Sequence, residues 1–454
     1  MADTLTLINW IILTGTFFFL IVLSGSSFRE KEIRAAVISL IFLILNTFFW
    51  RFFLTASPVF QPFNIFMISL LVLFGLVSFI KYFPRKPAKR ETSKAQQYDE
   101  RNNMFARNNI QHHPKLMETY YAQHPENKTI DQQIHNKPEF GEKEQAYHDA
   151  YSAPCYEAAF EHLERSIPLS TGNVAKQKTP IDPVLFSKAI KDISKFYGAC
   201  DVSFLRLKSH HFYSHKGRHA KNWGDKTDQS HKTAIAIVVP MRVEMIKKGP
   251  TSSVLQESAQ KYVEAAKISN ILAGYIRNFG YPARAHNDAN YDTLCVPIAC
   301  ESGIGELGRM GIFMHRVHGP CVRLAIVTTD LELPDSSLQK PLYMEEFCKI
   351  CKKCADNCPS GSITHDDEPY SRNFRHWSIQ QEKCFSYWKT IGSDCGLCIS
   401  VCPYTKPDTL FHKFVRFYIS RNILNQKIAL FMDDLLYGRY KKIAKINPDK
   451  IFCA

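Results

Sequence analysis

The chain has 454 residues, of which 45% are hydrophobic, and this share excludes a wholly disordered polypeptide. At about 150 residues per domain, the length predicts two or three folding units. The formal net charge of +14 suits a nucleic acid, an anionic membrane surface or an acidic partner, so charge alone selects none of them.

Three apolar runs open the chain, over residues 7–23, 35–54 and 63–83. Each is close to the roughly 20 residues that cross a bilayer as a helix. A cleaved signal peptide is the alternative for the first run, but residues 1–10 contain no Lys or Arg, and a twin-arginine signal is also missing. The sequence therefore predicts a three-helix membrane anchor over residues 1–83.

Basic residues around these runs predict how the anchor is oriented. The loop before the second run contains Arg29, Lys31 and Arg34, whereas residues 55–62 contain no basic residue. Six basic residues follow the third run: Lys81, Arg85, Lys86, Lys89, Arg90 and Lys94. The positive-inside rule then predicts a multi-pass protein of the inner cell membrane, with its N-terminus outside and its catalytic domain in the cytoplasm. The basic run is expected to contact anionic lipid. A plain tether is the simplest role for the anchor, and contact with a quinone or a redox partner is the alternative.

The rest of the chain changes character twice. Residues 84–179 are polar and basic, which predicts a linker and N-terminal extension. Residues 180–340 show an α/β pattern, with helices expected at 181–198 and 258–279 and strands at 233–241, 281–285 and 322–329. Strands that alternate with helices predict an α/β sheet with crossover helices. A C-terminal helical segment is expected over residues 411–454.

Eight of the 14 cysteines lie within residues 341–410. The first motif, Cys348-x2-Cys351-x2-Cys354-x3-Cys358, is followed by Pro359 and matches the bacterial ferredoxin spacing. The second runs from Cys395 through Cys398 to Cys402, before Pro403, with Cys384 upstream. Zinc is the alternative, but zinc sites prefer two Cys pairs held apart. The sequence therefore predicts a ferredoxin-like domain with two 4Fe–4S clusters.

The spacing also predicts which cysteines share a cluster, because the Cys before Pro ligates the neighbouring cluster in such paired motifs. One cluster is assigned to Cys348, Cys351, Cys354 and Cys402. The other is assigned to Cys384, Cys395, Cys398 and Cys358.

Four further segments form a pattern with the cysteine motifs. They are Glu301-Ser-Gly-Ile-Gly-Glu-Leu-Gly-Arg-Met-Gly311, Gly319-Pro-Cys-Val-Arg323, Val327-Thr-Thr-Asp-Leu331 and Asp433-Asp-Leu-Leu-Tyr-Gly-Arg439. This pattern resembles the cobalamin-dependent reductive dehalogenases, whose superfamily includes the epoxyqueuosine reductases. The resemblance covers residues 180–439, over half of the chain.

The resemblance implies a nitroreductase-like α/β domain over residues 180–340 that binds a base-off corrinoid (cobalamin), with one cluster beside it. Many members are held at the membrane by a separate protein with three spans, and the three runs here look like the same tether in one chain. The family's usual enzymes are exported by a twin-arginine signal, whereas the topology of this chain predicts a cytoplasmic domain, and we follow the topology.

Site residues follow from the same resemblance. Arg309 matches a basic residue that stabilises developing negative charge. Glycines of the same run would let the backbone approach the corrinoid, with a tight turn as the alternative: Gly303, Gly305, Gly308 and Gly311.

The family also has a Tyr proton donor just after the strand at residues 233–241. Val243 occupies that position, and no Tyr lies between Tyr213 and Tyr262. Glu244 is the candidate acid in its place, since epoxyqueuosine reductases use a carboxylate, and a solvated Glu is the alternative.

Three functions are compatible with these features. The first is a membrane-anchored reductase in which a ferredoxin, flavodoxin or quinol-linked donor sends electrons through the clusters to a corrinoid. The corrinoid reduces a small organic substrate, by halide loss if the family chemistry holds. The second is an electron-transfer protein with a degenerate site, which the missing Tyr favours. The third is a tRNA-modifying reductase, and it is the least expected because the basic residues cluster at the membrane junction.

Overall fold

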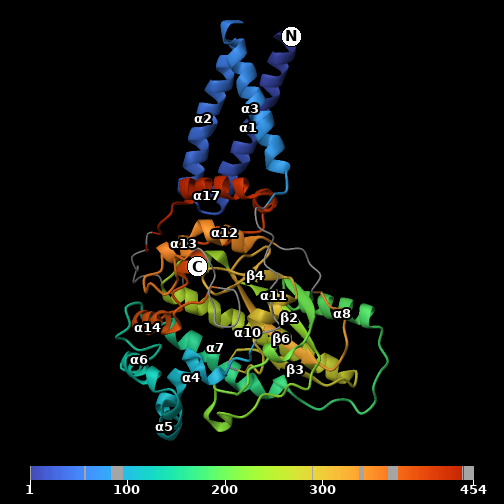
Figure 1. Ribbon diagram of the computed structural model, residues 1–454, viewed down its shortest axis with the longest axis vertical. Coiled ribbons are helices and arrows are strands. Elements are labelled where there is room, and N and C mark those ends of the chain that lie inside the picture. Colours follow the sequence, from blue (N-terminus) through green and yellow to red (C-terminus); the bar gives the residue numbers. More distant parts are fainter. Residues whose placement is uncertain are drawn as a thin grey trace. The chain divides into compact units, whose positions relative to one another are not determined.

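The computed structural model describes residues 2–55, 58–82, 96–288, 290–336, 342–366, 377–441 and 443. The chain forms two compact units (Figure 1). The anchor unit comprises Met1–Ala88 and Pro407–Tyr440, and the core unit comprises Lys89–Lys406 and Lys441–Ala454. The basic run at residues 85–94 and the end of the chain, residues 444–454, lie outside the described residues.

Three long helices dominate the anchor unit: α1 (Ala2–Arg29), α2 (Ile33–Thr55) and α3 (Gln61–Phe79). All three are long and apolar enough to cross a membrane. Large apolar side chains point outward from them, and Phe48 is 70% exposed. Between α1 and α2, the Asn46 side-chain amide donates a hydrogen bond to the Thr16 hydroxyl at 2.9 Å. These helices have the exposed apolar surface of a membrane anchor, as the sequence predicted.

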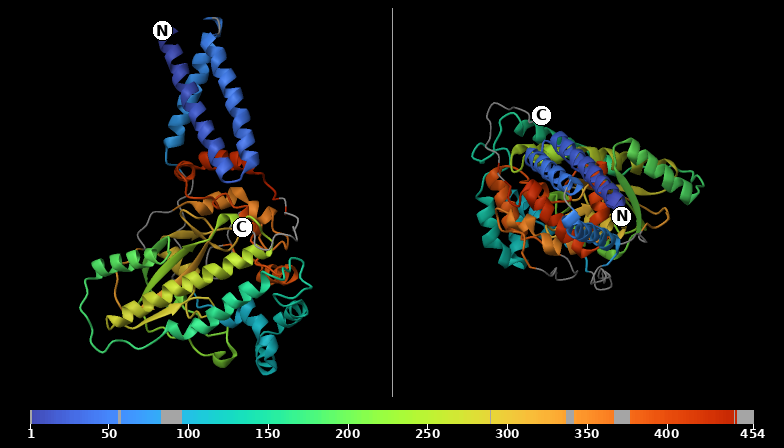
Figure 2. Two further views of the ribbon diagram at one scale, coloured as in Figure 1. Left: turned by 180° about the vertical axis from the view of Figure 1, so that it is seen from behind. Right: turned by 90° about the horizontal axis from the view of Figure 1, so that it is seen from above.

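Two C-terminal helices, α16 (Leu410–Ile419) and α17 (Ile423–Tyr437), also belong to the anchor unit. Figure 2 shows them at one end of α1–α3. The Asn425 side-chain amide donates to the carbonyl of Ser78 at 2.9 Å, and Leu436 packs with Leu23 and Ala35. The segment expected as a separate C-terminal piece therefore packs on the anchor, because its buried Asn side chains bond the end of α3.

A four-stranded sheet lies at the centre of the core unit. Its order is β1 (Asp201–Arg206), β2 (Thr233–Pro240), β6 (Val322–Thr329) and β3 (Ala283–His286), and every neighbouring pair is antiparallel. Since β2 and β3 both pair with β6, they run parallel to each other. Helix α10 (Ser252–Asn278) connects them and is the expected crossover helix.

Apolar side chains cover both faces of this sheet. On one face Ile235 and Ile237 pack against Leu272 and Ile276 of α10. On the other face Ala236 packs with Ile298 of α11 (Cys295–Glu301) and with residues of the hairpin β4 (Gly305–Leu307) and β5 (Phe313–His315). Burial on both faces explains the unbroken apolar run of β2. The shorter helices α8 (Pro183–Phe196) and α9 (Val243–Ile246) flank these elements in the sequence.

The described part of residues 84–179 is folded, which differs from the linker expected there. It forms α4 (Met104–Asn109), α5 (Pro114–Gln123), α6 (Pro125–His135) and α7 (Ala153–Ser166). Helix α7 packs on α10, and α4 and α6 pack on α14 (Gln381–Ile391). The polar composition hides this order because the buried groups are paired: Arg107 bonds Asp131 and Glu382, each at 2.6 Å.

Replacing Asp131 with Ala tests this packing. The change leaves the buried Arg107 guanidinium without the carboxylate that accepts hydrogen bonds from two of its nitrogens. We therefore expect the free energy of unfolding to fall by about 3–5 kcal/mol. The measurement is the thermal unfolding midpoint of the purified full chain. Glu118→Ala, at an exposed position of α5, is the control and should stay within about 0.5 kcal/mol. Equal midpoints for the two variants would contradict this account.

Candidate functional site

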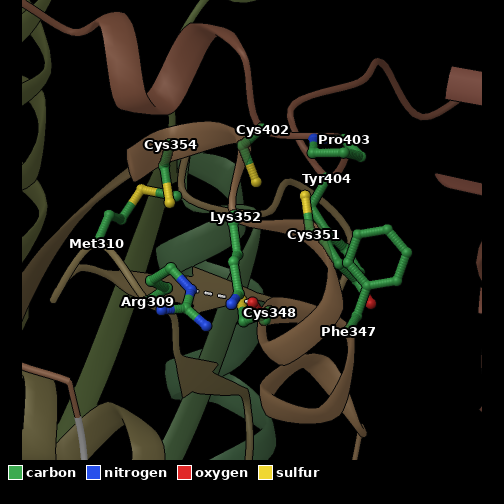
Figure 3. Close-up of a pocket in the computed structure, with 10 residues that line it drawn as sticks. All are labelled: Arg309, Met310, Phe347, Cys348, Cys351, Lys352, Cys354, Cys402, Pro403 and Tyr404. Atoms are coloured by element: carbon green, nitrogen blue, oxygen red, sulfur yellow. Dashed lines mark hydrogen bonds between the residues drawn. The ribbon is translucent and has the colours of Figure 1, made fainter. Parts of the chain in front are cut away.

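Four cysteines from both motifs line one cavity in the core unit: Cys348, Cys351, Cys354 and Cys402. Figure 3 shows their sulfur atoms around the same space. Cys348 and Cys351 lie on α12 (Met344–Cys351), and Cys354 lies on α13 (Lys353–Asp356). Between these helices Lys352 has a positive φ of 57°, which turns the chain so that successive cysteines face inward. We call these four residues the first cysteine group.

The remaining four cysteines form the second cysteine group: Cys358, Cys384, Cys395 and Cys398. Burial raises the pKa of the Cys384 thiol to about 12, and repulsion from Cys395 and Cys358 adds to the shift. The Cys398 pKa is raised well above its ordinary value by burial, then by Cys395, Cys354 and the rest of its group. The structure thus brings Cys358 to the second motif and Cys402 to the first, and the crossed ligation of two clusters stays a prediction of the spacing.

Buried thiols of this kind need a cation to become thiolates. Burial raises the pKa of Cys348 and of Cys354 to about 12, and neighbouring cysteines raise both further. Positively charged iron offsets this cost because a coordinating thiol is deprotonated outright. Four inward-facing thiols in each group are the donor set of a 4Fe–4S cluster, so the residues present fit two such clusters.

Arg309 lies at the first cysteine group (Figure 3). Its side chain is fully buried, and its Nε donates to the carbonyl of Cys348 at 3.0 Å. Its Nη1 donates to the carbonyls of Thr364 and Asp366 at 2.9 and 2.6 Å. The residue proposed for catalysis is therefore held against a cluster ligand.

The glycines of the same run pack against this chain's own backbone and side chains. A Cβ at Gly305 would lie 2.2 Å from the carbonyl oxygen of Met314, and one at Gly308 would lie 2.3 Å from the sulfur of Met314. Gly303 and Gly311 have positive φ angles of 80° and 67°. These contacts support the tight-turn alternative, because the glycines allow β4 and β5 to approach each other.

The proposed acid, Glu244, lies on α9 and is exposed to solvent. The structure does not bring it together with Arg309, which is fully buried beside the first cysteine group. An exposed carboxylate at this position matches the solvated-Glu alternative.

Sequence reasoning missed a polar group that adjoins the second cysteine group, which we call the arginine–tyrosine cluster: Ser258, Tyr262, Arg323 and Asp394. The Arg323 guanidinium lies over the Tyr262 ring, 4.8 Å from its centroid. Arg323 Nη2 donates to the Ser258 hydroxyl at 2.5 Å and lies 3.3 Å from the Asp394 carboxylate. Asp394 precedes the cluster ligand Cys395 in the chain. The arginine–tyrosine cluster therefore joins α10 and β6 to the second cysteine group.

Burial controls the protonation of this cluster. It raises the pKa of Tyr262 to about 12, against the opposing effect of Arg323. Burial also raises the pKa of nearby Tyr291 well above its ordinary value. Among the described residues, the buried Arg323 Nε has no hydrogen-bond partner. A neutral phenol can donate a proton, and a fixed cation beside it can stabilise the phenolate that remains.

Two weak signals for this cluster exist in the sequence. Arg323 is the one charged residue of the strand VRLAIVTT, and a lone charge in a buried strand requires a partner. Ser258 and Tyr262 are four residues apart on α10 and so share a face. Neither signal identifies the partner, because Asp394 is far away in the sequence.

Comparison with known proteins adds to this geometry. The family described as 4Fe-4S dicluster domain matches residues 347–406, which include all eight cysteines of the two groups. A tetrachloroethene reductive dehalogenase of Desulfitobacterium hafniense is 31% identical over 247 residues, which are 51% of this chain and 43% of that protein. Over about half of its length the chain is therefore similar to the reductive dehalogenases.

The fold of the chain is also similar to that of a solved reductive dehalogenase. A solved catabolic reductive dehalogenase superposes with a TM-score of 0.61 at 20% identity, over 79% of this chain and 50% of that chain. An epoxyqueuosine reductase of Lactococcus garvieae is more distant, at 26% identity over 32% of this chain and 40% of that protein. The chain spans less than half the length of the dehalogenase relatives that it matches. The chain therefore combines a fold like that of a reductive dehalogenase with a domain for two 4Fe–4S clusters.

Two cysteine variants test the crossed arrangement. Cys402→Ala removes a ligand of the first cluster and Cys358→Ala one of the second, so each should lower the iron content from roughly eight toward four per chain. Electron paramagnetic resonance of the reduced proteins should show that the two variants lose different signals. Cys155→Ala, at an exposed cysteine outside both groups, is the control and should keep full iron. Loss of the same signal in both variants would contradict the crossing.

Proposed function

We propose that the protein is a membrane-anchored oxidoreductase of reductive dehalogenase type. Electrons pass through two 4Fe–4S clusters to a corrinoid, and an organic halide is reduced with loss of halide. The observation that carries this proposal is the contact of Arg323 with Tyr262 and Asp394 beside the second cysteine group. It puts a proton donor and an anion-stabilising cation next to the electron supply, which a simple electron carrier does not need.

A corrinoid requires polar partners around its amide-bearing edge and its phosphate. The core unit has a pocket with three cationic side chains, lined by Glu100, Lys216, Arg218, His219, Asn222, Arg284, Asn290, Tyr291 and Asp292. Among the described residues, two of its buried donors, Arg218 Nε and Asn290 Nδ2, have no hydrogen-bond partner. These residues fit the polar periphery of a corrinoid in donor capacity.

When bound, the corrinoid supplies strongly reducing cobalt chemistry. The reaction breaks the carbon–halogen bond and forms a carbon–hydrogen bond, which requires two electrons and one proton. The clusters deliver the electrons one at a time, and the Tyr262 hydroxyl supplies the proton. Arg323 stabilises the tyrosinate that remains, and the halide leaves as an anion.

The order of the clusters follows from their neighbours. The second cysteine group adjoins the arginine–tyrosine cluster through Asp394 and Cys395. Cys354 of the first group contributes to the raised pKa of Cys398 in the second group, so the two groups lie close together. We place the first cluster nearer the donor, which is a low-potential carrier of the ferredoxin, flavodoxin or quinol-linked class.

The position of Tyr262 also bears on the alternatives. The absence of a Tyr near Val243 favours the hypothesis of an electron-transfer protein without a substrate. Because Tyr262 beside Arg323 is a candidate proton donor, that absence no longer argues against catalysis. Nothing in the arginine–tyrosine cluster favours tRNA as a substrate.

The first experiment is the metal content of anaerobically purified full chain from a corrinoid-producing host. We expect roughly eight irons and one cobalt per chain, and halide release from chlorinated or brominated alkenes and phenols with a reduced viologen as donor. Full iron without cobalt, or cobalt without halide release from any of these substrates, would overturn the proposed function.

Tyr262→Phe tests the proton donor. We expect the rate of halide release to fall by about 10²–10⁴-fold with the cobalt and iron contents unchanged. Tyr275→Phe is the matched control on the same helix, where Tyr275 stacks on Phe186, and should keep full activity. Because the Tyr262 pKa is raised to about 12, its hydroxyl stays protonated below that pH. The unsubstituted enzyme should therefore lose no activity through deprotonation of Tyr262 in mildly alkaline buffer. An equal rate for Tyr262→Phe would exclude this role.

We also propose that the anchor lies in the inner membrane with the core unit in the cytoplasm, in contact with anionic lipid. The α1–α2 loop, with Arg29 and Lys31, lies at the end of the bundle where α16 and α17 pack. Exposed apolar and basic side chains alternate on α16, with Leu410 85% exposed, Phe414 53% exposed and Lys413 nearby. Such a helix suits the headgroup region of a membrane.

Reporter fusions test this orientation. Alkaline phosphatase fused after Phe60 should be active, because that loop is expected outside, and a fusion after Lys31 should be inactive. Green fluorescent protein at the same positions should give the reverse pattern. The opposite pattern for both reporters would place the core unit on the outer side.

A further inference from the structure

One buried polar atom beside the first cysteine group has no role in the mechanism above. It is Nη2 of Arg309, for which the described residues provide no hydrogen-bond partner. The other two guanidinium nitrogens, Nε and Nη1, donate to backbone carbonyls. Leaving a buried charged donor unsatisfied is costly, so an acceptor is expected at Nη2 when the protein is complete.

The guanidinium is held in a rigid cage. The ring of Trp377, itself 1% exposed, packs on it with the Arg309 Cζ 4.6 Å from the ring centroid. The carbonyl of Asp366 accepts hydrogen bonds both from Arg309 Nη1 and from the Trp377 indole at 3.2 Å. Arg309 lines the same cavity as Cys348, Cys351, Cys354 and Cys402 (Figure 3). Its charge therefore cannot swing away from the first cysteine group.

The charged groups beside the two cysteine groups are arranged differently. The Arg309 guanidinium lines the cavity of the first group and donates to backbone carbonyls. At the second group the Asp394 carboxylate, one residue before Cys395, is paired with Arg323 at 3.3 Å. Glu306 opposes Arg309, but three backbone N–H groups at the start of α12 already bond its carboxylate.

We propose that Arg309 tunes the first 4Fe–4S cluster, donating from Nη2 to a cluster sulfur or cysteine sulfur and raising that cluster's reduction potential above that of the second. Reduction adds one electron to a cluster and breaks no bond. A fixed cation and a hydrogen bond to sulfur both stabilise the more negative reduced state. Arg309 is thus a positioning and tuning residue for electron transfer, and the proposal is independent of the organic substrate.

Such a difference in reduction potential gives the two clusters different roles in electron transfer. The first cluster accepts electrons readily from the donor and holds them. The second, beside Asp394 and the arginine–tyrosine cluster, remains the stronger reductant next to the site of chemistry.

The test is a redox titration of the full chain with both clusters assembled, followed by electron paramagnetic resonance. The signal that is absent in Cys402→Ala identifies the first cluster. In Arg309→Gln we expect the ratio of reduced to oxidised first cluster at a fixed potential to fall about tenfold, which is about 59 mV for a one-electron couple. The second cluster should shift less. Arg206→Gln, which removes an exposed charge at the end of β1, should change neither potential.

Arg309→Lys keeps the charge but loses the planar guanidinium, and we expect a smaller fall of the first-cluster potential. Unchanged potentials in an Arg309→Gln protein with full iron would overturn the proposal, as would an equal shift in Arg206→Gln. If Arg309→Gln does not assemble the first cluster, Arg309→Lys decides the question. A lowered first-cluster potential in that variant supports the proposal, and an unchanged one overturns it.

Discussion

Five buried and three partly buried cysteines need a metal cation to become thiolates, and the core unit depends on this constraint. Burial raises the pKa of Cys348, Cys354 and Cys384 to about 12, so these side chains cannot ionise in the packed protein unless iron binds them. Because each group combines cysteines from both motifs, bound iron would link α12 and α13 to the segment around residues 384–402. Arg309 and Trp377, which pack beside the first group, would be positioned by the same links.

The two cysteine groups differ in the residues that surround them, and this difference supports the proposed direction of electron transfer. A buried guanidinium faces the first group, whereas a carboxylate, its arginine partner and a phenol adjoin the second. The phenol and its guanidinium partner thus lie together at the second group, whereas Arg309 lies at the first. The polar pocket around Arg218 and Asn290 shares Tyr291 with the surroundings of the second group, which is why we propose it for the polar edge of the corrinoid.

Several features follow from local patterns and were predicted correctly. The apolar runs of α1–α3, the β2 and β6 strands and the helix α10 each carry a periodicity that depends on near neighbours in the chain. The cysteine spacing predicted two clusters for the same reason, while the crossed ligand sets stay a prediction. The segment expected as a linker shows the limit of this approach, since its order comes from Arg107 pairing with Asp131 and with the distant Glu382.

The sequence by itself determined the membrane anchor, the two clusters and the relationship to reductive dehalogenases, because those signals lie in contiguous stretches or fixed spacings. Only the tertiary structure decided which polar residues work together. Arg309 matched a catalytic position in the sequence and lies instead against a cluster ligand, while Tyr262, Arg323 and Asp394 meet from a helix, a strand and a loop. Contacts between residues far apart in the chain leave no periodic trace, and packing alone selects them.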